Sequence, residues 1–111
     1  MSSPSVTPDL QTAAEVIDLS SRVVTQGLRQ LSSTGGADKH QVLAYDLAHA
    51  ASAVETARSL LDYGSKGDHE GLIACAFTAD MAHELMTKLI GRETLWGLDA
   101  NPLAATLPFI T

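Results

Sequence analysis

Four histidines are the side chains of this sequence best suited to binding a metal: His40, His49, His69 and His83. Helical metal sites usually present two histidines four residues apart or a Glu-x-x-His repeat, because these spacings place both ligands on one face of a helix. No pair here has either spacing. We therefore interpret all four as surface or hydrogen-bonded histidines, and no metal is predicted. A site shared by His49 and His83 across two helices remains an alternative.

The other polar residues show no pattern that is typical of catalysis. Glu55, Arg58 and Asp62 recur at helical spacing and resemble a solvated row of ion pairs. Gly35-Gly36 lacks the residues that accompany a phosphate-binding loop. No nucleophile motif surrounds the serines that we considered, which are Ser20, Ser21, Ser52 and Ser59. The sequence thus predicts no catalytic and no cofactor-binding residue.

Cys75 is the one cysteine of the chain, so it cannot form an internal disulfide. It lies within the apolar run 72–77, and a free cysteine in such a run usually packs as a small hydrophobic residue. We expect Cys75 to be buried.

Apolar residues recur at steps of three and four over three long stretches, which predicts an all-α fold: an antiparallel bundle of three long helices with a short C-terminal helical turn. The expected helices span about 8–32, 39–63 and 69–95, and either Gly91 or the Trp96-Gly97 step ends the third. Short polar turns join them, at 32–37 and 64–67, and such turns make neighbouring helices antiparallel. The stripes include Leu10, Ala13, Ile17, Val24, Leu28 and Leu31; then Leu43, Leu47, Ala50, Val54, Ala57 and Leu61; then Leu72, Cys75, Ala76, Ala79, Ala82, Met86, Leu89 and Ile90.

Helix ends are predicted from capping residues. Thr7, Asp38 and Asp68 are the expected N-caps of the three helices, since short polar side chains can accept a hydrogen bond from the first turn. Gly64 is expected to end the second helix in a left-handed conformation. Asp18 and Arg22, four residues apart, are expected to form a minor ion pair.

The segment after the third helix is too apolar for a free tail. Trp96 can close the end of the bundle, or it can anchor an interface, where tryptophan is favoured. We take Trp96, Leu103, Leu107 and Phe109 as the possible interface residues. Asn101 is expected to cap the short helical turn.

The chain has 111 residues and a net charge of −6, which fits one acidic domain, with residues 1–7 as a disordered tail and 8–111 as the bundle. An acidic surface repels phosphate groups, so neither nucleic acid nor an anionic membrane is an expected partner. No apolar run approaches the about 20 residues of a membrane span. The start of the chain resembles no secretory signal, so a cytoplasmic location is expected.

Three stretches resemble the helical region of flavin-dependent acyl-CoA dehydrogenases, and are most similar to a helical extension that precedes the catalytic part of some long bacterial members. They are Tyr45-Asp46-Leu47-Ala48-His49-Ala50-Ala51, Leu61-Asp62-Tyr63-Gly64 and Gly91-Arg92-Glu93-Thr94-Leu95-Trp96-Gly97. Gln41 at the helix start, Glu55, and the alanine-rich run 74–85 add to the resemblance. It implies a helical fold and a role in acyl-CoA oxidation.

The departures from that family concern its catalytic parts. The flavin-contacting Arg-x-x-Phe-Gly motif is replaced by residues 35–40, and the Gln-x-x-Gly-Gly loop by residues 89–94. The segment that carries the catalytic base is missing. Abstraction of a proton beside a thioester needs both a base and a flavin that accepts hydride. FAD is therefore implied for the family, and not for this chain.

Two functional hypotheses follow. In the first, the chain is an accessory or assembly domain related to acyl-CoA dehydrogenases, non-catalytic when isolated, that buries an apolar face against a dehydrogenase core or a second copy of itself. In the second, it is a stand-alone helical bundle that dimerises and binds a metal or a protein partner, with His49, Glu55 and His83 pointing inward.

Overall fold

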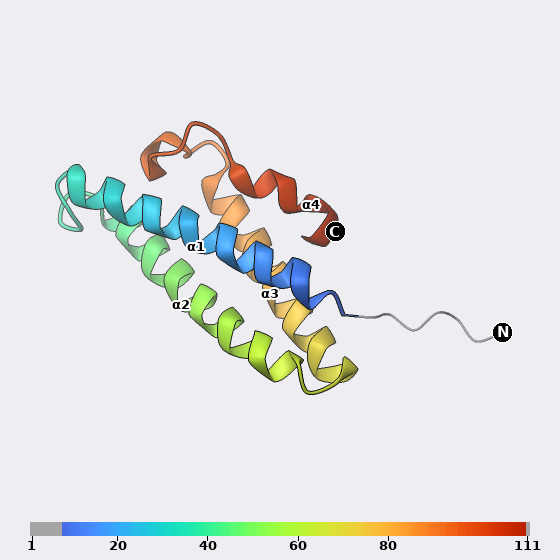
Figure 1. Ribbon diagram of the computed structural model, residues 1–111. Coiled ribbons are helices and arrows are strands. Elements are labelled where there is room, and N and C mark those ends of the chain that lie inside the picture. The colour runs from blue at the N-terminus through green and yellow to red at the C-terminus, as the bar shows by residue number, and fades with distance from the viewer. Residues whose placement is uncertain (1–7, 111) are drawn as a thin grey trace.

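The computed structural model describes residues 8–110, so the expected tail at 1–7 lies outside the described residues. Three long helices run antiparallel and are followed by short helical turns (Figure 1). Residues 8–110 contain no β-strand, which confirms the predicted all-α class. The elements are α1 (Leu10–Ser33), α2 (Gln41–Gly64), α3 (Asp68–Leu89), two 3-10 turns η1 (Thr94–Trp96) and η2 (Pro102–Thr106), and α4 (Leu107–Ile110).

The N-caps differ from those predicted. Asp9, and not Thr7, caps α1: its carboxylate accepts hydrogen bonds from the backbone N–H of Thr12 at 2.9 Å and from the Thr12 hydroxyl at 2.6 Å. His40 occupies the N-cap position of α2, in place of Asp38, and makes no capping bond with its side chain. Gly67 precedes α3, so Asp68 is the first helical residue, where its charge still favours the helix dipole.

The third helix is shorter than predicted. It ends at Leu89 and not at residue 95, because Gly91, one of the two ends expected from the sequence, adopts a left-handed backbone conformation with φ 77°. The chain then folds back over the end of the bundle through η1. Residues 90–97 therefore form a cap above the helices and do not extend α3.

Gly64 is not the left-handed stop that the sequence suggested. It is the last residue of α2, it is buried, and the described residues with positive φ do not include it. A Cβ atom at this position would lie 2.9 Å from the Cβ of Ala74 and 3.3 Å from the Cα of Gly71. Gly64 thus serves the close approach of α2 to α3.

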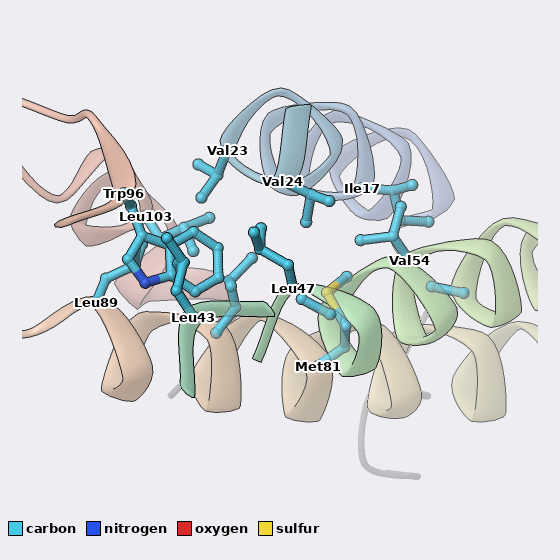
Figure 2. Close-up of a cluster of buried hydrophobic side chains, with 13 residues drawn as sticks. Ile17, Val23, Val24, Leu43, Leu47, Val54, Met81, Leu89, Trp96 and Leu103 are labelled. Carbon is cyan, nitrogen blue, oxygen red and sulfur yellow. The ribbon is translucent and has the colours of Figure 1, made fainter. Parts of the chain in front are cut away.

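Aliphatic side chains from all three helices meet along the axis of the bundle, and Trp96 fills one end of this core (Figure 2). The Trp96 ring is fully buried, as are Leu43, Leu89 and Leu103 near it. On α1, Gly27 leaves the space that the ring occupies: a Cβ there would lie 2.8 Å from Trp96 Cε3 and 2.6 Å from Leu47 Cδ2.

The C-terminal segment returns along the bundle toward the start of α1 (Figure 1). Asn101 holds its bend, as predicted: its side-chain oxygen accepts from the N–H of Leu103 at 3.1 Å, and its amide nitrogen donates to the Met86 carbonyl at 3.3 Å. The segment η2–α4 then packs on α1 and α3.

We predict that Gly27→Ala destabilises the fold. Alanine gains about 1 kcal/mol over glycine within a helix, but an extra methyl group in a filled core costs about 1–3 kcal/mol. Ala48→Gly, at an exposed position of α2, measures the difference in helix propensity between alanine and glycine in the same protein. Urea denaturation should show that both variants lose stability. A Gly27→Ala protein that gains what Ala48→Gly loses would show that Trp96 is not tightly packed there.

Candidate interaction surfaces

The four residues proposed as interface anchors are placed unequally. Trp96 and Leu103 are 0% exposed within their own chain, so their contacts are internal and neither side chain is presented to a partner. Phe109 is partly exposed and lines an apolar pocket of about 260 Å³ between α1 and α4, together with Val16 and Leu19. The Leu107 side chain lies outside what the structure describes.

Polar contacts hold the Trp96 segment in place. Gln26 on α1 donates its amide N–H to the carbonyl of Gly97 at 3.1 Å, and Gly97 has the left-handed φ of 74° that turns the chain after η1. The indole Nε1 of Trp96 is buried and meets no hydrogen-bond partner within the described part of the chain. The ring is therefore fixed mainly by packing.

The histidines lie at the surface, as expected. His49, His69 and His83 are exposed, and His40 is partly exposed with its Nε2 3.1 Å from the Thr34 carbonyl. Over residues 8–110, no three His, Cys, Asp or Glu side chains are grouped to hold a metal ion. Glu55 is also exposed, with 77% of its side chain accessible. Thus His49, Glu55 and His83 do not point into the core of this chain.

Ion pairs on the surface differ in part from the predicted ones. Arg58 lies 3.3 Å from the carboxylate of Asp18 and 4.0 Å from that of Glu55. Asp18 therefore pairs across to α2, while Arg22 reaches only its backbone oxygen, at 3.5 Å. All these groups are well solvated, and such pairs contribute about 0–1 kcal/mol.

Asp46 is a buried charged residue that the sequence reasoning did not single out. It is 9% exposed, and its carboxylate lies 3.9 Å from the Arg92 guanidinium, which ties α2 to the segment after α3. The sequence does indicate its burial, because Asp46 falls on the apolar stripe of α2 beside Leu43, Leu47 and Ala50. An acidic residue at such a position needs a partner when it is buried.

A shallow groove of about 240 Å³ lies between α2 and α3. Its edges carry His49, Ser52 and Ala53 from α2 and Glu84 and Lys88 from α3, with Met81 and Leu85 among its apolar lining. Tyr45, which is 64% exposed, packs its ring on that of His49 with 4.3 Å between the centroids. We name the outer surface formed by Val42, Tyr45, His49, Glu84 and Lys88, with this groove, the α2–α3 face.

Three further large apolar side chains are exposed at the end of the bundle where α1 and α3 finish. They are Leu28 (47% exposed), Ile90 (62%) and Leu95 (39%), and we name this surface the η1 end. Tyr63, Leu72 and Ile73 are exposed near the opposite end of the bundle. Single exposed apolar residues are ordinary, and a contact surface typically needs several that are contiguous.

Cys75 is partly exposed, so the expectation of a buried thiol was wrong. Partial burial still raises the pKa of the Cys75 thiol, and this outweighs a hydrogen bond from the Asp9 backbone, which lowers the pKa. Asp9 itself has a lowered pKa, because the Thr12 hydroxyl and backbone N–H both donate to its carboxylate. Neither group lies in a site with convergent polar partners.

Comparisons with protein-family models, curated proteins and solved structures find no match to this chain. None of the helices described for residues 8–110 combines the length and the apolar character needed to cross a membrane.

We predict that the cap at Asp9 makes stability depend on pH in the acid range. Because the folded pKa is lowered, the stabilisation by Asp9 is complete above the unfolded pKa of about 4 and is lost as the pH falls through the folded value. Asp9→Ala should therefore lower the free energy of unfolding at pH 7, and the difference from the natural protein should shrink below about pH 4.

Asp9→Asn is the matched control, since an amide caps a helix without titrating. Urea titrations between neutral and acid pH would measure all three proteins. A gap between the natural protein and Asp9→Ala that persists unchanged at the lowest pH would contradict the assigned cap.

Proposed function

We propose that this chain is a non-catalytic helical domain related to acyl-CoA dehydrogenases, which docks on a flavin-dependent acyl-CoA oxidising enzyme as an accessory or assembly module. The proposal starts from the sequence resemblance. The observation that carries it further is the way in which two of the resembling stretches, 45–51 and 91–97, meet in space.

Asp46 of the first stretch pairs with Arg92 of the third, and Leu47 and Trp96 both pack against Gly27. Residues shared with the family would therefore define one folded unit. The same stretches also contain side chains that folding leaves outside, namely Tyr45 and Leu95. Apolar side chains that the core does not use are available for a partner.

The η1 end is the proposed docking site for the dehydrogenase. Ile90 lies next to the segment 91–97, and Leu95 belongs to it. The buried Trp96 and the Arg92–Asp46 pair hold this segment on the bundle, so binding would require little ordering of the chain. Complete burial of a large aliphatic side chain contributes about 1.5–3 kcal/mol, which is enough for two residues to dominate a contact of ordinary size.

The second hypothesis stays a prediction in both its forms, a metal or a protein partner. His49, Glu55 and His83 are exposed, so a metal held by them would have to lie between two copies of the chain. Stoichiometric transition metal in the purified protein, measured by elemental analysis, would favour the metal form.

We predict that the purified chain binds the acyl-CoA dehydrogenase encoded in frame with it or next to it, and that Ile90→Ser/Leu95→Ser weakens this binding at least tenfold. Tenfold corresponds to about 1.4 kcal/mol. Because Ile90 is 62% and Leu95 39% exposed, burying the exposed parts of both side chains together contributes about 1.5–3 kcal/mol. Isothermal titration calorimetry would measure the affinity, and circular dichroism would verify that the variant folds. Tyr45→Ser is the control, since Tyr45 lies outside the η1 end.

No binding to that dehydrogenase at high concentration would exclude the proposal. Flavin retained by the isolated chain, or oxidation of acyl-CoA by it, would exclude the non-catalytic role.

A further inference from the structure

We infer that the α2–α3 face pairs with a second copy of this chain in a two-fold, antiparallel dimer. This inference deepens the proposed docking function by naming a second face and its partner, but it does not depend on the resemblance to acyl-CoA dehydrogenases.

The charges of α3 are the first argument. Glu84 and Lys88 both line the groove, and within the described residues no ion pair joins them. They lie two residues before and two residues after position 86. We place a two-fold axis in the plane of the interface, perpendicular to the helices at the level of position 86, so that α3 of one copy packs antiparallel on α3 of the other. Glu84 of each copy then lies next to Lys88 of the other, and the surface is complementary to itself.

The shape of α2 supports the same axis. Gly64 of α2 lies against Gly71 of the antiparallel α3. Fifteen residues from this contact along each helix, His49 of α2 lies level with position 86 of α3. Tyr45 and Ala53 are each four residues from His49. The axis that pairs the charges thus also places the projecting Tyr45 ring of one copy over the small residues Ser52 and Ala53 of the other.

The acidic end of the molecule stays clear of this contact. Asp62, Asp68 and Glu70 lie near the turn between α2 and α3, at least 13 residues from His49 along α2 or beyond its end. At 1.5 Å per residue, antiparallel pairing separates the two acidic ends by about 40 Å. This exceeds the screening length of about 8–10 Å in physiological salt.

The size of the contact indicates a weak dimer. The overlap runs from the start of α2 to about residue 57, which is ~24 Å of helix, and two helices about 10 Å apart make it ~20 Å wide. The two copies would bury ~1,000 Å² in total, which is near the lower limit of specific interfaces. We expect dissociation in the micromolar range.

Sedimentation equilibrium of the full chain, without any dehydrogenase, tests the dimer. Tyr45→Ser should weaken dimerisation at least tenfold, and Lys88→Glu should weaken it likewise because two like-charge pairs replace two ion pairs. The exchange Glu84→Lys/Lys88→Glu should restore it, since the order of charges is reversed in both copies. Ile90→Ser/Leu95→Ser should leave it unchanged.

Cross-linking tests the axis directly. His49→Cys in a Cys75→Ser background should form a disulfide-linked dimer on mild oxidation, whereas Cys75→Ser alone should not. A chain that remains monomeric to millimolar concentration, or a dimer that is insensitive to Tyr45→Ser and to the charge exchange, would overturn the inference. Loss of dehydrogenase binding with an intact dimer would instead count against the proposed function alone.

Discussion

The burial of Trp96 beneath the end of the bundle is the contact on which the rest of this structure depends. The ring joins segments that are distant in sequence: Gly27 of α1 provides the space, Leu43 and Leu47 of α2 line it, and Leu103 closes it from the C-terminal side. Because Gly91 ends α3 early, the chain can turn back and place the indole there. The two polar links nearby, Gln26 to Gly97 and Asp46 to Arg92, hold the same segment from α1 and α2.

This arrangement separates residues that hold the fold from residues that remain free to bind. Trp96 and Leu103 are residue types that occur often in interfaces, but both side chains are buried within their own chain. The side chains left outside are less conspicuous in the sequence, and they include Tyr45 on α2 and Ile90 and Leu95 around η1. Ile90 and Leu95 belong to the cap of residues 90–97, which the buried Trp96 holds on the bundle, and Tyr45 lies on α2. Side chains that the fold already holds in place lose less entropy on association.

The fold was largely predictable from the spacing of apolar residues, since a period of 3.6 over more than twenty residues has few other solutions. The residues at which the helices begin and end were less predictable. Asp9, Asp38 and Asp68 all have capping chemistry, but only Asp9 makes the capping bonds, and that choice depends on backbone angles that a residue type alone does not fix. Likewise, Gly64 and Gly91 look equally suited to end a helix. Gly64 is needed for the close packing of α2 against α3, and Gly91 for a left-handed turn. Only the contact with the neighbouring helix distinguishes the two.

The contact surfaces were harder to predict, because amphipathic patterning concerns only which side of a helix is buried. On α3 even that side was predicted wrongly in part: Leu72, Ala76 and Ile90 of the expected stripe are exposed. The buried side instead carries Ala74, Met81 and Leu85. Tyr45 lies four residues before His49, and Glu84 four before Lys88, and each pair alone would be an ordinary exposed pair. The antiparallel register of α2 and α3 relates the two pairs. It places position 86, midway between Glu84 and Lys88, level with His49, which is midway between Tyr45 and Ala53. A register shift of two residues, about half a helical turn, would move the axis to position 84 or 88, so that Glu84 or Lys88 would face its own copy. The relation of the two helices, set by the glycine contact at Gly64 and Gly71 and by the core they share, therefore determines whether this surface can recognise its own copy.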